Sequence, residues 1–193
     1  RDDPLRTLRA LRFGARGFDL STDALDEMKL HASAVTGLSA SGYASGTVLD
    51  EMSKILMGHN VVEALRIARD TNVLATLFPE LSAMLGFDQG SRYHDLTTDE
   101  HTFIALEHAA QLEAPLRVRW ALLFHDSGKP ETWWKGTDGR KHYYAMPQKE
   151  QDYRRARTID IRPDSLLDHE VVSERLWLSA ADRINVTKRL RDD

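Results

Sequence analysis

Cysteine is absent from this sequence of 193 residues. Its absence excludes disulfide bonds and thiolate metal sites, so a metal site must use His, Asp or Glu side chains. The sequence also lacks a run of about 20 apolar residues, the length that crosses a bilayer, and no signal peptide opens it. These absences favour a protein of the reducing cytoplasm that has no membrane partner.

Basic charge is not in excess either, because 26 Lys and Arg residues stand against 30 Asp and Glu residues. The net charge of −4 argues against a surface that is basic throughout and coats nucleic acid, so any RNA contact must be regional. One basic region lies at the start, where residues 1–18 carry five Arg and two Asp residues.

This basic region has the pattern of an amphipathic helix that begins at Pro4. Its apolar face carries Leu5, Leu8 and Leu11, and another face carries the arginines Arg6, Arg9, Arg12 and Arg16. An arginine face is as often plain solvated surface as it is a phosphate or nucleotide contact, for which arginine is chemically suited. Composition alone leaves both interpretations open.

Hydrophobic spacing predicts a mainly all-α protein with two units. Residues 1–84 form a bundle of short helices, in which Ser21, Thr22 and Asp23 are candidate caps of the second helix and residues 37–46 are a Ser- and Gly-rich loop. Residues 85–92 have the character of a linker, and residues 93–193 form a second helical unit.

The second unit begins with Thr97 and Glu100 at the spacing of a capping box. His101 follows in the first helical turn and shares a face with Ile104, so this imidazole is expected to point inward. A further apolar helix ends at His125-Asp126, before a helix-stopping glycine and a proline.

Beyond that helix, the pattern predicts a small β-hairpin with its turn at Asp138-Gly139. Residues 148–157 are polar and predict an exposed helix or a mobile insertion. A helix starting near Asp168 brings His169 inward, and residues 179–182 are expected to cap a final helix that contains Leu190.

Four residues on three helices form a plausible ligand set for a divalent metal: His101, His125, Asp126 and His169. Each histidine alone is more often a satisfied core or surface residue, but the combination favours ligation. The ligand types do not distinguish Mg, Mn, Ni, Co, Fe and Zn. A metal here would lower the pKa of bound water to about 7, and Lys129 is placed to meet an anionic substrate. We therefore predict His125, Asp126 and Lys129 as catalytic residues for phosphoester hydrolysis.

This arrangement resembles the H…HD…D pattern of the HD phosphohydrolase superfamily. The resemblance implies that His101 and the His125-Asp126 pair bind metal and that Lys129 matches the lysine that often follows the pair. It also implies that His169 is the additional family histidine that can serve a second metal. The final family aspartate has no convincing match, since Asp182 lies in a predicted helix cap.

Four further segments extend the resemblance to a closer family. Residues 2–13, 50–56, 77–81 and 93–102 are similar to the neck and the following HD region of bacterial tRNA nucleotidyltransferases and poly(A) polymerases. Relative to that family, the insertion between Tyr144 and Asp168 is longer than usual. The catalytic head of the family would precede residue 1, so the resemblance implies that this chain alone does not transfer nucleotides.

In that family, an acidic pair and an arginine at the start of the neck pair with the base of the incoming CTP or ATP. The matching positions are Asp2, Asp3 and Arg6, and Arg9 and Arg12 continue the same arginine face as candidate RNA or nucleotide contacts. The implied partner is RNA, tRNA in particular, or a nucleotide.

Three hypotheses remain at this point. The leading one joins an RNA-binding neck to a metal-dependent phosphohydrolase that acts on a nucleotide 2′- or 2′,3′-cyclic phosphate or on an RNA-end phosphate. The second is a non-catalytic RNA- or nucleotide-binding module in which the HD fold is a scaffold. The third is a structural α-helical domain whose histidines are satisfied within its core.

Overall fold

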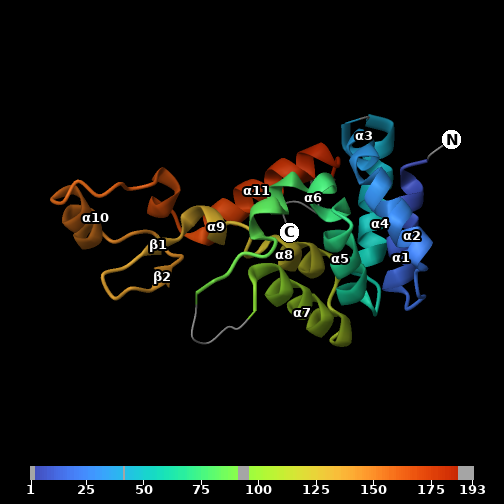
Figure 1. Cartoon of the computed structure of the whole chain (residues 1–193), viewed down its shortest axis with the longest axis horizontal. Helices are drawn as coiled ribbons and strands as arrows, with labels where there is room; N and C mark the ends of the chain where they lie inside the picture. The colour runs from blue at the N-terminus through green and yellow to red at the C-terminus, as the bar shows by residue number, and fades with distance from the viewer. Residues whose placement is uncertain (1–2, 41, 91–95, 187–193) are drawn as a thin grey trace.

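Helices make up most of the computed structural model, which describes residues 3–40, 42–90 and 96–186 (Figure 1). Within these ranges the one sheet is a two-stranded antiparallel hairpin. The prediction of a mainly all-α fold with a small β excursion is therefore confirmed.

Short helices joined by tight turns build the first unit. They are α1 (Leu5–Ala15), α2 (Thr22–His31), η1 (Ala32–Val35), α3 (Thr36–Ala40), α4 (Gly42–Leu56), α5 (Val61–Asp70), α6 (Val73–Leu77) and η2 (Pro79–Met84). As the pattern predicted, Leu8 and Leu11 are buried. Of the three candidate caps, Ser21 caps α2, since its hydroxyl accepts a hydrogen bond from the Ala24 amide at 3.2 Å. Local sequence signals thus set the helix starts and the buried face here.

The prediction of a loop over residues 37–46 was wrong, because α3 and α4 run through most of that stretch. Glycine and serine lower helix propensity by at most about 1 kcal/mol per residue, which tertiary packing can override. The packing is visible at Leu38 and Val48, which are both buried in the core.

The second unit combines helices with the hairpin. Its elements are α7 (Thr98–Gln111), α8 (Leu116–Phe124), α9 (Lys129–Thr132), β1 (Trp134–Lys135), β2 (Lys141–His142), α10 (Gln148–Arg155), η3 (Pro163–Leu166) and α11 (His169–Arg183). The predicted final helix capped by residues 179–182 was wrong, because α11 continues through these residues to Arg183. Ala180 and Ala181 are fully buried there, so core packing extends the helix past a local start signal. Leu190 lies outside the described residues.

The predicted capping box at the start of α7 does not form. Thr97 holds the N-cap position, but its side chain makes no cap hydrogen bond. Glu100 instead receives hydrogen bonds from Arg66 and Arg69 of α5, at 2.8 Å and 2.5 Å. Asp99, which is 1% exposed, also pairs with Arg69 at 3.0 Å. Two long-range guanidinium groups thus replace a weaker local contact and join α5 to α7.

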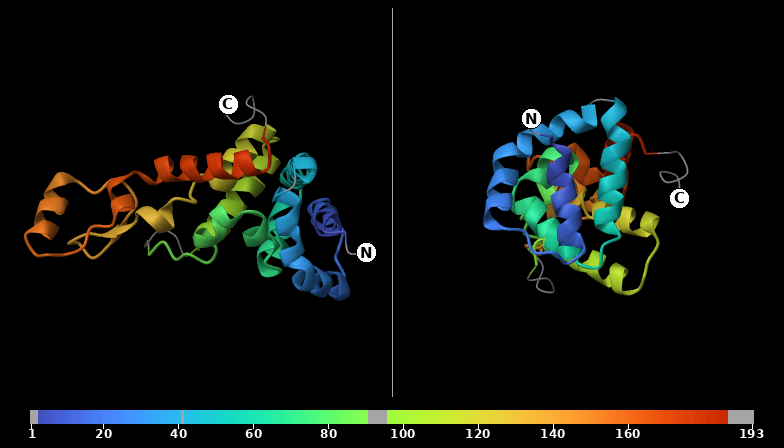
Figure 2. Two further views of the ribbon diagram at one scale, coloured as in Figure 1. Left: turned by 90° about the horizontal axis from the view of Figure 1, so that it is seen from above. Right: turned by 90° about the vertical axis from the view of Figure 1, so that its right-hand side faces the viewer.

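Residues 133–167, which we call the arm, project from the helical body (Figures 1 and 2). The hairpin at its base pairs Trp134 with His142, and Gly139 adopts the left-handed conformation of the predicted turn, with φ of 79°. Residues 148–155 form α10, as expected of an exposed helix, and none of them is buried. The arm therefore adds little to the core.

A single core runs through both units. Phe78, at the end of α6, is fully buried and contacts the rings of Trp120 and Phe124 from α8 edge-on, with centroids 6.0 Å and 5.8 Å apart. The division into residues 1–84, a linker over 85–92 and a second unit stays a prediction, and the described apolar core is continuous across it. None of the described helices is long and apolar enough to cross a membrane.

Truncating Phe78 tests this continuity. Phe78→Ala is expected to lower the free energy of unfolding by about 3–5 kcal/mol, because it leaves a cavity between the two units. The wild-type protein should unfold in urea in one transition, since a shared core couples its parts. Phe18→Ala, at a side chain that is 57% exposed, should change the stability by less than about 0.5 kcal/mol. Two separate wild-type transitions would contradict the coupling.

Candidate metal centre

His101 enters the site from the first turn of α7. The buried stripe of this helix is Thr98, Thr102, Phe103 and Leu106, and the His101 side chain lies at its border, 34% exposed. The imidazole is therefore held against the core by its neighbours on the helix while one part of it remains accessible to solvent. This position suits a ligand better than full burial would, because substrate and water must reach a catalytic metal.

His125 and Asp126 follow directly after α8. The buried residues Leu123 and Phe124 fix the end of the helix, and Asp126 is 3% exposed. His125 Nδ1 lies 2.7 Å from the carbonyl oxygen of Leu122, which fixes the orientation of the ring. The sequence pattern thus correctly placed this polar pair where an apolar helix ends.

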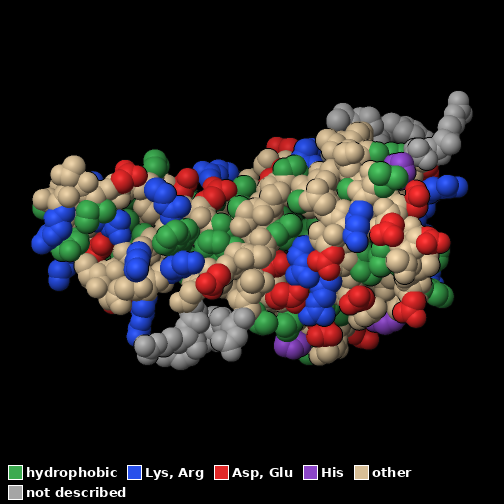
Figure 3. All heavy atoms as spheres, in the orientation of Figure 1, with side chains coloured by type: hydrophobic (Ala, Val, Ile, Leu, Met, Phe, Trp, Pro, Cys, Tyr) green, Lys and Arg blue, Asp and Glu red, His purple; other side chains and the backbone are tan. Residues whose placement is uncertain are grey.

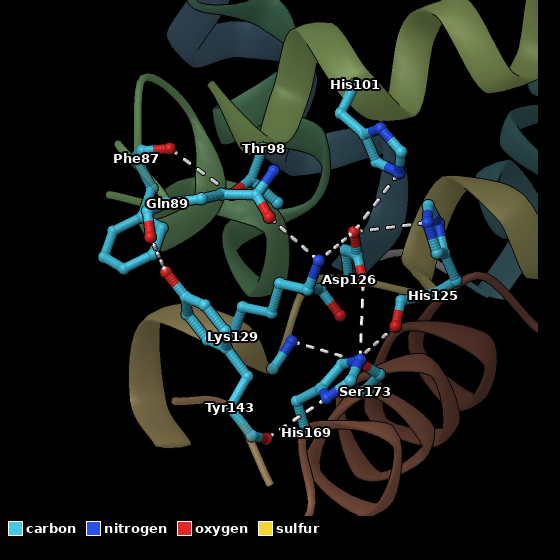
Figure 4. Close-up of polar contacts among 12 residues, drawn as sticks. Phe87, Gln89, Thr98, His101, His125, Asp126, Lys129, Tyr143, His169 and Ser173 are labelled. Carbon is cyan, nitrogen blue, oxygen red and sulfur yellow. Dashed lines mark hydrogen bonds and ion pairs between the residues drawn. The ribbon is translucent and has the colours of Figure 1, made fainter. Parts of the chain in front are cut away.

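The Asp126 carboxylate is surrounded by nitrogen atoms (Figure 4). Its Oδ2 lies 3.6 Å from His101 Nε2, 3.3 Å from His125 Nε2 and 2.7 Å from Lys129 Nζ. Its Oδ1 lies 3.5 Å from Nε2 of His169. One ligand atom each from His101, His125 and Asp126 all fall within 4.8 Å of one another, so these three residues could hold a metal ion. His169 lies beside this group, on the other carboxylate oxygen.

Close backbone contact brings His169 and α11 to the site. A Cβ atom added at Gly128 would lie 2.4 Å from the carbonyl oxygen of His169, so only glycine leaves room for α11 here. Ser173 bridges the two segments, since its hydroxyl accepts from the Gly128 amide and donates to the His125 carbonyl oxygen, both at 2.9 Å. The spacing between the His125-Asp126 turn and α11 is therefore set by main-chain contacts.

The protons on the imidazoles follow from their main-chain partners. His125 Nδ1 faces the Leu122 carbonyl, and His169 Nδ1 lies 3.2 Å from the Tyr143 carbonyl oxygen. A carbonyl oxygen only accepts, so each Nδ1 carries the proton. In a neutral ring, Nε2 then carries a lone pair that points at the Asp126 carboxylate. The lone pair and the carboxylate repel each other unless a proton or a cation lies between them. The lone pair of His125 Nε2 and the Asp126 carboxylate, together with His101, fit a divalent cation, and His169 offers a further lone pair beside them.

The pKa shifts agree with this need for positive charge. Burial acts to lower the pKa of His125, but the hydrogen bond and the charge of Asp126 outweigh it and raise that pKa above its ordinary value. Burial acts to raise the pKa of Asp126, but contacts from His125, His169 and Lys129 hold it well below its usual range. The carboxylate is therefore charged at neutral pH and attracts a proton or a metal.

Sequence patterns did not reveal two further residues of the site, Gln89 and Tyr143. Gln89 is 3% exposed, and its Oε1 accepts a hydrogen bond from Lys129 Nζ at 2.9 Å. The Tyr143 hydroxyl donates to the main-chain oxygen of Gln89, and its ring lies under Lys129 Nζ at 5.5 Å. Gln89 fell in the predicted linker and Tyr143 beside the predicted hairpin, where no helical spacing points at a site.

The predicted nucleotide-contact residues lie far from this centre, on α1. Asp3 and Arg6 line a groove of about 230 Å³ between α1 and α2. Arg9 reaches the Asp3 carboxylate at 3.5 Å, whereas Arg12 is turned toward Glu51 of α4 at 3.1 Å. The remaining predicted contact, Asp2, lies outside the described residues.

Comparison with known proteins now identifies the chain's relatives. A family described as "Probable RNA and SrmB-binding site of polymerase A" matches residues 48–85. Proteins named multifunctional CCA protein match about two thirds of the chain. Those from Azoarcus sp. (strain BH72), Pseudomonas fluorescens (strain SBW25) and Paracidovorax citrulli (strain AAC00-1) are 36%, 37% and 38% identical, over 68% of this chain and 32% of each relative. No solved structure gives a significant match.

The described fold is mainly α-helical, and residues 48–85 match an RNA-binding region of polymerase A type. The chain belongs to the tRNA nucleotidyltransferase and poly(A) polymerase family and contains the neck region of that family. It spans about a third of the length of the curated relatives it matches.

The Ser173 bridge gives a first test of the site's construction. Ser173→Ala is expected to lower the free energy of unfolding by about 1–3 kcal/mol, since the buried Gly128 amide and His125 carbonyl each lose a partner. Ser179→Ala makes the same change on the exposed side of α11 and should cost less than about 0.5 kcal/mol. Equal effects of the two substitutions in urea unfolding would contradict the bridging role.

Tyr143 gives a test at high pH. Burial, together with the negative charges of Asp88 and Asp126, raises the pKa of Tyr143 to about 12. A raised folded-state pKa adds stability that is complete below the unfolded-state pKa of about 10 and is lost as the pH rises through 12. Wild type should therefore exceed Tyr143→Phe in stability at pH 8, and the difference should shrink between pH 10 and 12. A constant difference in urea unfolding would contradict this.

Proposed function

We propose that this chain is a cytoplasmic HD-type phosphohydrolase joined to an RNA-binding neck. Its substrate is a nucleotide 2′- or 2′,3′-cyclic phosphate or the phosphate at an RNA end. The observation that carries the proposal is the buried Asp126 carboxylate, which three imidazole nitrogens and one ammonium group surround. Such a centre is built for a cation and an anionic substrate together.

Each residue of the centre then has a distinct task. His101, His125 and Asp126 would hold the metal, and a bound divalent ion lowers the pKa of water to about 7 and orients a phosphate. Lys129 stays fixed between Asp126 and Gln89, so its ammonium group offers a positioned charge to a phosphate oxygen. Tyr143 remains protonated at neutral pH and holds the Gln89 backbone, so it orients the lysine and does not act as a base.

The neck is proposed to bind RNA, with tRNA as the preferred class. Support comes from the family match over residues 48–85 and from the relatives named CCA proteins. The groove between α1 and α2 is proposed to receive a nucleotide, with Asp3 as a hydrogen-bond acceptor. Arg6 is the donor there, since no carboxylate of the described residues lies within ion-pair distance of it.

One observation favours a second candidate function, a binding module whose HD fold is only a scaffold. Lys129 Nζ already lies 2.7 Å from Asp126, and its charge partly neutralises the carboxylate without any metal. In this case the RNA- or nucleotide-binding neck would carry the function. Measuring the metal content and the hydrolytic activity of the same preparations separates the two candidates.

The experiment uses purified protein supplied with Mn, Ni, Co or Mg. We expect about one metal ion or more per chain in the wild type, and metal-dependent hydrolysis of 2′,3′-cyclic AMP or of RNA carrying a terminal phosphate. His125→Ala should lose both properties, because it removes a ligand and the partner that orients Asp126. Loss of a ligand or its orienting contact typically costs at least 10- to 100-fold in metal affinity.

The matched control for the histidine substitution is His108→Ala, which removes an exposed imidazole from α7. This variant should keep the metal content and the activity of the wild type. Metal binding without hydrolysis of any of these phosphoesters would refute the phosphohydrolase. The absence of both, with RNA affinity unchanged in His125→Ala, would support the scaffold.

A further inference from the structure

The arm is largely exposed, and its helix α10 buries none of its residues against the rest of the protein. The arm extends away from the body in two perpendicular views (Figures 1 and 2). Arg154 joins two parts of it, with contacts to Glu150 at 3.1 Å and to the main-chain oxygen of Lys135 at 2.5 Å. A projecting segment that adds little to the core leaves its side chains available to a partner.

Charge distinguishes the arm from the rest of the chain. Residues 133–167 contain eight Lys and Arg residues against five Asp and Glu residues, whereas the remaining residues contain 18 against 25. Figure 3 shows several of these blue side chains on the face of the arm turned to the viewer. A net charge of +3 on a projecting segment of an acidic protein favours a polyanionic partner.

Most acidic groups of the arm already have partners. Glu150 pairs with Arg154, Asp152 pairs with Arg155, and Asp164 pairs with an arginine of α11. In contrast, six cations of the arm have no carboxylate within ion-pair distance among the described residues. They are Lys135, Arg140, Lys141, Lys149, Arg157 and Arg162. The positive charge of these six is therefore left for an external anion.

Aromatic rings lie among these cations. The guanidinium of Arg157 stacks over the Tyr153 ring at 3.9 Å, and Tyr153 is 38% exposed. Arg162 and Lys141 lie 5.0 Å and 5.1 Å from the Trp133 ring. Stacked arginine and tyrosine planes bind nucleobases regardless of sequence, while neighbouring cations bind phosphates. This combination fits single-stranded nucleic acid better than it fits an anion without bases.

The base of the arm borders His169, the histidine beside the candidate metal ligands. A groove of about 720 Å³ runs from Lys141 and Tyr144 to His169 and Glu170. Tyr143, which lies between them, accepts hydrogen bonds from the His169 amide and ring through its carbonyl oxygen. A strand lying on the arm would therefore have a path along this groove as far as His169, whose Nε2 lies 3.5 Å from Asp126 Oδ1.

We propose that the arm is an RNA-contact surface, separate from the neck, that binds single-stranded RNA and leads its end along this groove to the metal centre. RNA binding by the arm does not depend on the proposed function. Delivery of the RNA end to the centre rests on the proposed hydrolysis. The arm then selects RNA ends over small phosphoesters, since a mononucleotide is too short to touch both α10 and the centre.

The test measures binding of a fluorescent single-stranded RNA of about 12 nucleotides to the full chain at several salt concentrations. Lys149→Glu and Arg157→Glu should each weaken binding roughly three- to tenfold and lower the slope of log K against log salt by about 1. Arg117→Glu, an exposed position on α8, changes the net charge equally and should leave the slope unchanged. Thermal unfolding confirms that the variants are folded. Equal slopes for all three variants would overturn the proposal.

Stacking is tested separately from charge. Tyr153→Ala should weaken RNA binding roughly five- to tenfold and leave binding of heparin, a polyanion without bases, unchanged. Ile159→Ala removes a comparably exposed apolar side chain of the arm and should leave both unchanged. If Tyr153→Ala weakened neither, or weakened both equally, nucleobase contact by the arm would be refuted.

Delivery is tested with two substrates. Arg157→Glu should raise the KM for RNA carrying a terminal phosphate and leave hydrolysis of 2′,3′-cyclic AMP unchanged. Equal KM values for the RNA in wild type and variant would overturn delivery. If neither substrate is hydrolysed by any variant, the proposed function fails, and the arm as an RNA surface is decided by the binding measurements alone.

Discussion

The charge on one buried carboxylate organises the second half of this protein. Asp126 is almost fully buried, and a buried anion is stable only when nearby positive groups or hydrogen bonds compensate for lost hydration. Residues from α7, α8 and α11 meet at it, and Lys129 brings in the loop of Gln89. The imidazoles of His101, His125 and His169 all turn Nε2 toward this carboxylate. A proton or a cation between each Nε2 and the carboxylate would compensate its charge.

The neck and the candidate metal centre pack directly against each other at their junction. Phe78 is inserted among the aromatic rings of α8, and Arg66 and Arg69 of α5 hold the residue just before His101. The position of α7, and of His101 on it, is therefore supported by contacts from α5. Since residues 48–85 match the RNA-binding family, any partner bound there contacts helices that also support the centre.

Local sequence patterns predicted the features that depend on residues close together in the chain, such as helix boundaries. The ends of α8 and α11 were marked by helix stop and start signals, so His125, Asp126 and His169 were found from sequence. The loop over residues 37–46 and the capping box were wrong, because long-range packing and the α5 arginines outweigh weak local preferences. The Lys129–Gln89 and Tyr143–Gln89 contacts join residues 40 and 54 positions apart, so no periodicity foretells them.

The contact between Asp126 and His169 also has a topological consequence. These two residues stand immediately before and after the segment that holds the whole arm, and their side chains lie 3.5 Å apart. The Asp126–His169 contact therefore closes a loop that contains the arm. The entropy cost of closing a loop grows only with the logarithm of its length. Doubling the loop costs about 0.6 kcal/mol. The chain can therefore carry a long insertion between two residues of its centre without changing their separation.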